Sequence, residues 1–306
     1  MQQTFAKLPD NRCNCEDCCG CLQVSSNTMT THQPKNIKEF EDINKDIRRD
    51  SWSPYRAFFR GQSEDWPIVS GINRNNKFTK EQVLLQEKNL IKEFCESKFL
   101  GYNIQNHIFE KDFKYAQKWS SIFQAQHIGL KTRLTDWTET YEHALSFALQ
   151  NVNNNSKIDL KRKLDAVLWV YKCPYNEMFL INFNKPENHK FFDLNPFDLT
   201  ETMAIKHMGM SNNGIDCIGE NKRLRQDGSF LITCNKDFST SVENIERIKP
   251  HIEKIIINPE LKNELLEDYL KPGLANYINY KTTDDEINDF KKLEEKIKIL
   301  NAKHFD

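Results

Sequence analysis

The sequence lacks the short motifs that identify several large enzyme classes. It contains no GxxxxGK[ST] phosphate loop, no GxGxxG after a strand, no GxSxG nucleophile elbow and no HExxH zinc-binding pair. These patterns belong to P-loop nucleotidases, Rossmann-type dinucleotide enzymes, α/β-hydrolases and zinc proteases. The chain is therefore expected to carry its function on a different arrangement of residues.

The sequence also lacks an excess of charge of either sign and any long apolar run. Lys and Arg number 43 and Asp and Glu number 44, for a formal net charge of −1. This balance argues against a generally basic surface for nonspecific nucleic-acid binding, and leaves a local basic patch open. No stretch is apolar enough to span a membrane, and the first residues, MQQTFAKLPDNRC, lack the apolar core of a secretory signal. We expect a cytoplasmic protein without a membrane partner.

The composition and the apolar patterns predict an α+β fold. Aromatic residues make up 11% of the chain and include 20 Phe, which favours a packed core. Short apolar or aromatic runs bounded by Gly, Pro or Asn are typical of strands. We expect a small mixed β-sheet surrounded by helices, with strands near residues 55–62, 166–172, 228–234 and 254–258.

Three regions are expected along the chain. Residues 1–35 form a flexible Cys-rich extension and linker, residues 36–281 the main domain, and residues 282–306 an amphipathic C-terminal helix. Such a helix either docks on the domain or pairs with another copy of the chain.

The extension contains a dense cysteine cluster. Five of the nine cysteines lie in CNCEDCCGC, namely Cys13, Cys15, Cys18, Cys19 and Cys21. In a reducing compartment, thiolates this close together are better ligands for a soft cation such as zinc than disulfide partners. The alternative is a flexible, redox-active leader without a defined metal. A metal shell would close within this loop or take a further ligand from Cys95, Cys217 or His32.

The densest group of polar side chains lies in residues 124–147, QAQHIGLKTRLTDWTETYEHALSF. Apolar residues recur at helical spacing before and after it, and Gly129 suits the left-handed residue that ends the first helix. We therefore expect residues 127–136 to form a short ordered loop that holds binding groups still between two helices.

A second candidate lies at the end of the strand expected over Tyr55–Gln62. Arg60 precedes Gly61, where a backbone without a side chain lets a ligand approach closely. An arginine at such a place can bind phosphate or carboxylate through its planar fork. The alternative is an arginine tied to a buried Asp or to backbone carbonyls.

Three stretches together resemble one family. The first is Phe59-Arg60-Gly61-Gln62 with Trp66 and Arg74 downstream. The second is Gln126-His127-x-Gly129-Leu130-x-Thr132-Arg133-Leu134-x-Asp136-Trp137-Thr138, which runs into Ala144-Leu145-x-Phe147-Ala148. The third is Arg225-Gln226-x-Gly228-x-Phe230. Over residues 37–280 the chain resembles the FRG domain, named for its Phe-Arg-Gly run. Members of this family are bacterial and phage-associated proteins, and several are linked to phage defence, so the resemblance implies a protein of this kind.

The motif residues contain neither a nucleophile nor paired carboxylates, and they suit the binding of an anionic, aromatic molecule such as a nucleotide. A fainter resemblance to ADP-ribosyltransferases implies that Arg60 holds NAD, although Gln226 stands where those enzymes place a glutamate. The expected catalytic residues are Arg60, His127 and Gln226. The expected ligand-binding residues are Gln62, Gln126, Thr132, Arg133, Asp136, Trp137 and Arg225.

Two functions follow from these residues. The first is an enzyme, an NAD-using ADP-ribosyltransferase or glycohydrolase that acts as a toxin or defence effector on a protein or nucleic-acid target. The second is a non-catalytic module that senses a nucleotide or a phage component. For single residues a structural role is the alternative: Arg133 can pair with Asp136, Trp137 can lie in the core, and His127 can cap carbonyls.

Overall fold

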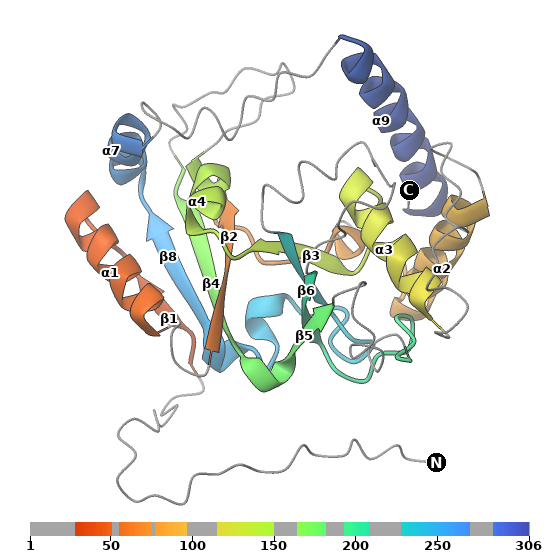
Figure 1. Ribbon diagram of the computed structural model, residues 1–306, viewed down its shortest axis with the longest axis horizontal. Helices are drawn as coiled ribbons and strands as arrows, with labels where there is room; N and C mark the ends of the chain where they lie inside the picture. Colours follow the sequence, from red (N-terminus) through yellow and green to blue (C-terminus); the bar gives the residue numbers. More distant parts are fainter. Residues whose placement is uncertain are drawn as a thin grey trace, which may run out of the picture.

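The computed structural model describes residues 28–50, 55–74, 77–96, 115–149, 164–181, 193–207, 228–269 and 284–305. Within these residues the chain forms an eight-stranded mixed sheet in the order β1-β8-β4-β2-β3-β7-β6-β5 (Figure 1). The strands are β1 Thr30–His32, β2 Tyr55–Gln62, β3 Leu134–Thr138, β4 Ala166–Pro174, β5 Met178–Ile181, β6 Met203–His207, β7 Gly228–Ile232 and β8 Ile252–Ile257. The helices are α1 Ile37–Asp50, α2 Lys80–Glu96, α3 Ala116–Ile128, α4 Tyr141–Leu149, α7 Pro259–Tyr269 and α9 Asp284–Phe305.

The predicted α+β class is confirmed, and the four predicted strands correspond to β2, β4, β7 and β8. The other four strands were not predicted from the sequence. β1, β5 and β6 are only three to five residues long. β3 is rich in polar residues, and we had expected its first residues to be loop.

The sheet divides into two halves between β2 and β3. β2 pairs with β4 over its whole length, from Tyr55 opposite Pro174 to Gln62 opposite Val167. It meets β3 at a single register pair, Phe59 opposite Thr138. β3 in turn pairs with β7 through all five of its residues. The two strands therefore diverge from one point of contact, and Figure 1 shows β3 turning away from β2.

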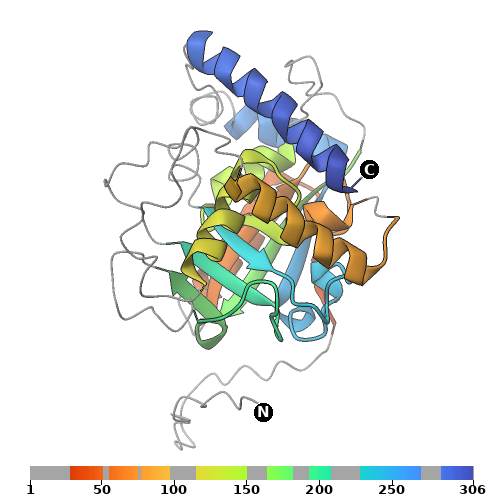
Figure 2. The ribbon, with the colours of Figure 1, turned by 90° about the vertical axis from the view of Figure 1, so that its right-hand side faces the viewer.

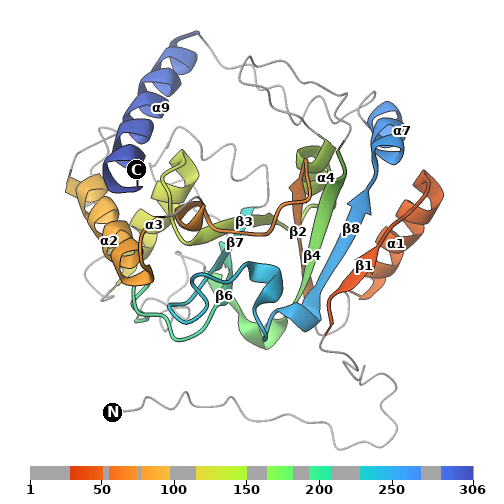
Figure 3. The same cartoon turned by 180° about the vertical axis from the view of Figure 1, so that it is seen from behind.

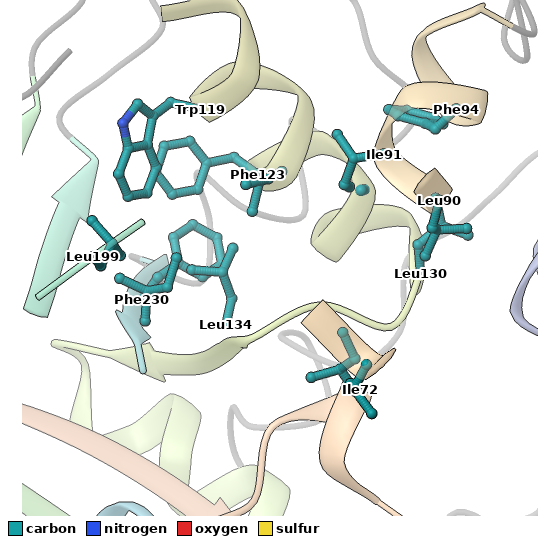
Figure 4. Packing of buried hydrophobic residues seen from close by; sticks show 14 of the residues in the cluster. Ile72, Leu90, Ile91, Phe94, Trp119, Phe123, Leu130, Leu134, Leu199 and Phe230 are labelled. Carbon is teal, nitrogen blue, oxygen red and sulfur yellow. The ribbon is translucent and has the colours of Figure 1, made fainter. Parts of the chain in front are cut away.

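Helices cover one face of each half. Apolar residues of α1, α4 and α7 pack on β2, β4 and β8, and Figure 3 shows α1 and α7 beside β8. Those of α2, α3 and α9 pack on β3, β6 and β7, and these helices lie in front of the sheet in Figure 2. In the second cluster Phe123 stacks on Phe230, at 5.3 Å between ring centroids (Figure 4). None of the described helices is long and apolar enough to cross a membrane.

The opposite face of the sheet is continuous across both halves. Phe58, Trp137, Trp169 and Leu231 lie in one cluster there. Ile68 and residues from the segment before β8 join them, namely Val242, Ile245 and Ile248. Because side chains alternate along a strand, Phe58 points to this face and Phe59 points to α4.

Gly61 lies where α4 crosses β2, on the same face as Phe59. A Cβ atom built on Gly61 would lie 1.8 Å from the carbonyl oxygen of Ala144 and 2.6 Å from the backbone nitrogen of Ala148. The glycine therefore admits the backbone of a helix. The sequence-based expectation that it admits a ligand was wrong, because the space above it is filled by α4.

Candidate functional site

A cavity of about 480 Å³ opens where β2 and β3 diverge. Its walls come from β2, from the turn at residues 69–74, from the end of α3, from β3 and from the last turns of α9. The polar residues among its described lining residues are Arg60, Arg74, Gln126, Lys131, Thr135, Asp136 and Asn301. Arg60, Gln126 and Asp136 were predicted as site residues, and the structure brings these three together.

Arg60 spans the opening between the two strands. Its Nη1 donates a hydrogen bond of 2.6 Å to the backbone carbonyl of Asp136. Its Nε is buried and has no hydrogen-bond partner among the described residues. Burial lowers the pKa of the Arg60 guanidinium from its ordinary value; Asp136 opposes this shift and the positive charge of Arg74 adds to it. The positive charge of Arg60 is thus only partly compensated.

Two more cationic side chains line the cavity. Arg74 donates from Nε to the carbonyl of Val69 at 3.3 Å, which holds it over the turn that contains the 3-10 segment Gly71–Asn73. The Nζ of Lys131 lies 5.5 Å from the centroid of the Phe305 ring. Asp136 is the one carboxylate among the described lining residues. Three cationic groups against one carboxylate make the described lining of the cavity favourable for an anion.

A chain of hydrogen bonds fixes the polar wall opposite Arg60. The backbone N–H of Leu134 donates to Thr132 Oγ1 at 3.1 Å, and that hydroxyl donates to Gln126 Oε1 at 2.6 Å. Gln126 Nε2 then donates to Asp136 Oδ2 at 2.8 Å. Because the carboxylate of Asp136 only accepts hydrogen bonds, it requires the Nε2 side of the Gln126 amide, and this fixes the orientation of that amide. Thr132, predicted as a ligand contact, lies behind Gln126 as its buried support.

The loop that holds this network is shorter than predicted. α3 continues through His127 to Ile128, and Gly129 ends it in the left-handed conformation, with φ of 94°, as expected. β3 then begins at Leu134, so that Asp136 and Trp137 belong to a strand and not to a loop. Neighbouring residues of a strand point to opposite faces. Asp136 can therefore line the cavity while Trp137 lies on the other face of the sheet.

Arg133 was expected to contact a ligand, and the structure places it in the interior instead. Its side chain is fully buried and pairs with the equally buried Glu87 of α2, at 2.6 Å from Nε to Oε2. It also donates to the side chain of Asn235 and to the carbonyl of Pro196. The alternative pairing with Asp136 was also wrong. Through these contacts Arg133 joins four segments of the chain in the interior.

Trp137 and Gln62 also lie away from the cavity. Trp137 is buried on the opposite face of the sheet, and its Nε1 donates to Thr135 Oγ1 at 3.0 Å. Gln62 is buried and accepts a hydrogen bond of 2.5 Å from Nε1 of Trp169. Trp137 therefore takes the core position that was its structural alternative, and neither residue is placed to contact a ligand in this cavity.

Several predicted site residues lie outside the part of the chain that the structure describes. These are Arg225, Gln226, the side chain of His127 and the cysteines Cys13, Cys15, Cys18, Cys19 and Cys21. Within the described residues, no group of three or more His, Cys, Asp or Glu side chains could hold a metal ion. The zinc hypothesis concerns the cysteine cluster and stays a prediction.

Sequence reasoning missed the contribution of α9. Asn301 and Phe305, near its end, line the cavity, and Ile297, Leu300 and Phe305 are buried in the cluster shared with α2 and α3. Docking, one of the two alternatives for this helix, is the arrangement seen. The amphipathic pattern of residues 282–306 predicts an apolar face, but it carries no information on which part of the protein that face covers.

The fold and the cavity define an α+β domain with a cationic pocket where its central sheet divides. The family model of the FRG domain matches residues 55–157, which confirms the resemblance over this part of the broader range expected. The matched segment contains β2, β3, α4 and every described lining residue except Asn301 and Phe305. Comparisons with curated proteins and with solved structures give no match.

Proposed function

We propose that the cavity binds a nucleotide through its phosphate groups. The observation that carries this proposal is that two arginines, Arg60 and Arg74, line the cavity, with the charge of Arg60 only partly compensated. Guanidinium groups bind phosphate oxygens through charge-assisted hydrogen bonds, about twice as strong as neutral ones. A phosphate between the two arginines would offset their mutual repulsion.

The rest of the cavity favours a nucleotide over free phosphate. A volume of about 480 Å³ lies within the range of roughly 300–1,000 Å³ that is usual for small organic ligands. Apolar atoms of Val69, Leu130, Leu134 and Phe305 also line it. Such a wall suits the flat, partly apolar base of a nucleotide, whereas a phosphate ion would leave most of the volume unused.

The enzymatic form of the proposal is an NAD-using glycohydrolase or ADP-ribosyltransferase that acts as a toxin or a phage-defence effector. The arginines would hold the pyrophosphate, and Asp136 would stabilise the ribosyl cation while the C–N glycosidic bond breaks. Nicotinamide then leaves with the bonding electron pair, and water or a macromolecular acceptor attacks the ribose carbon. This chemistry needs positioning and charge stabilisation and no protein nucleophile.

The alternative is a non-catalytic module that senses a nucleotide or a phage component. It is favoured by the state of Asp136, whose Oδ2 already accepts a hydrogen bond from Gln126, and by the lack of a second carboxylate among the described lining residues. Incubation with NAD separates the two forms. Release of nicotinamide or labelling of a macromolecule supports the enzyme, and binding without either supports the sensor.

Replacement of Arg60 by alanine tests the binding proposal itself. Loss of a charged hydrogen-bond donor costs about 1.5–3 kcal/mol, so the affinity for NAD should fall about 10- to 100-fold. Isothermal titration at low salt measures the change, and added salt should weaken binding by the wild type. Arg48→Ala is the matched control, because Arg48 pairs with Glu142 and does not line the cavity. Equal affinities of Arg60→Ala and wild type would refute the phosphate site.

A further inference from the structure

The last two turns of α9 contact the loop at residues 129–133, between α3 and β3, which forms one wall of the cavity. Asn301 makes two hydrogen bonds to the backbone of this loop. Its Oδ1 accepts from the N–H of Lys131 at 2.9 Å, and its Nδ2 donates to the carbonyl of Gly129 at 3.2 Å. The side chain of Asn301 therefore fixes the backbone at both Gly129 and Lys131, directly after the end of α3.

The same turns of α9 are attached to α2. Lys303 and His304 both contact the carboxylate of Glu93, at 2.7 Å and 3.0 Å, and their hydrogen bonds lower the pKa of Glu93. Ile297, Leu300 and Phe305 supply the apolar part of this contact.

The clamped loop leads directly into the polar network of the cavity. Thr132 follows Lys131, and its hydroxyl holds Gln126, which in turn holds Asp136. The carbonyl of Asp136 accepts the hydrogen bond from Arg60. A substitution of Asn301 can thus alter the position of the Arg60 guanidinium through a short series of contacts, each present in the structure.

We infer that the end of α9 is a positioning element of the pocket, so that docking of α9 and occupation of the pocket are coupled. The docked helix closes one wall with Phe305 and fixes the loop through Asn301. An undocked helix would leave the loop free to relax and would open that wall. By linkage, a ligand that needs the complete pocket stabilises the docked helix by the same factor by which docking strengthens the ligand. The part of this inference that concerns ligand binding rests on the proposed function.

Hydrogen exchange without ligand tests the positioning role. Asn301→Ala should raise the exchange of backbone amides in residues 129–137, and Phe305→Leu should do so while keeping an apolar side chain in the cluster. Lys298→Ala is the matched control, because Lys298 is an exposed residue of the same helix that does not line the cavity. Unchanged exchange over residues 129–137 in Asn301→Ala and Phe305→Leu, with both variants folded by circular dichroism, would overturn the inference.

The second arm uses NAD as the probe. Saturating NAD should slow amide exchange in residues 297–305 of the wild type, and Asn301→Ala should weaken NAD binding at least about 5-fold, with Lys298→Ala unchanged. If NAD binds the wild type and Asn301→Ala equally well and does not slow exchange in α9, the coupling is refuted. If NAD does not bind the wild type, the NAD proposal fails by itself, and the ligand-free comparison still decides the role of α9.

Discussion

Replacement of Arg133 by alanine should lower the free energy of unfolding by about 3–5 kcal/mol, the usual cost of removing one partner of a buried ion pair. Both Arg133 and Glu87 are fully buried, and their side chains are 2.6 Å apart. Glu87 also accepts the backbone N–H of Arg133 at 2.8 Å. The substitution would leave a carboxylate in the interior without its counter-charge. Since domains are typically stable by only about 5–15 kcal/mol, this variant should be close to unfolding at moderate temperature.

Urea denaturation of three variants measures this effect and separates its causes. Glu87→Gln retains the shape of the carboxylate and removes its charge. The double variant Arg133→Met/Glu87→Met replaces the pair by apolar side chains, and it should lose less stability than Arg133→Ala, because no buried charge is left unpaired. A loss below about 1 kcal/mol in Arg133→Ala, the size typical of exposed pairs, would show that this pair does not hold the segments together.

Gly61→Ala should be the other severe substitution, although it adds only one methyl group. The ideal position of that methyl lies 1.8 Å from the Ala144 carbonyl oxygen, and the contact is with backbone, which cannot rotate away. α4 would have to move off β2. Overpacking in a core costs about 1–3 kcal/mol and sometimes more, and we expect the upper end of this range. Movement of β2 would also shift Arg60, so ligand affinity should fall as well.

Gly71 provides a matched control for this substitution. A Cβ atom at Gly71 would meet its nearest neighbour, the Cα of Lys131, at 3.7 Å, which is an ordinary contact. Gly71→Ala should therefore change the midpoint of thermal unfolding little, while Gly61→Ala should lower it by many degrees. Similar midpoints for the two variants would contradict the tight packing of α4 on β2.

The packing of α4 on β2 also gives each residue of the Phe-Arg-Gly run, Phe59 to Gly61, a physical role. Strand alternation sends Phe59 and Gly61 toward α4 and leaves Arg60 pointing away from it. Phe59 packs edge-on against Tyr141 of α4, at 5.9 Å between ring centroids. The outer residues of the run thus fix the strand, and the middle one extends across the opening to β3.

The sequence predicted the fold well where apolar pattern and burial coincide. β4 and β8 are long apolar strands, and their assignment needed no tertiary information. β3 was missed because Thr135, Asp136 and Thr138 make it read as a polar segment. Only its pairing with β7 through all five residues shows it to be a strand.

The site was predicted in part for a related reason. Arg60, Gln126 and Asp136 could be selected because they stand in a dense polar motif. Arg133 stands in the same motif, but its partner Glu87 lies 46 residues earlier, so spacing alone could not separate a structural arginine from a binding one. Asn301 contacts Lys131 across 170 positions, and no local pattern records a contact of that range.

The most direct test of the central claim is a crystal structure of the protein grown with saturating NAD. We expect electron density in the cavity between β2 and β3, with the pyrophosphate between the guanidinium groups of Arg60 and Arg74 and one face of the ligand against the end of α9. NAD bound elsewhere on the protein, with this cavity empty, would contradict it.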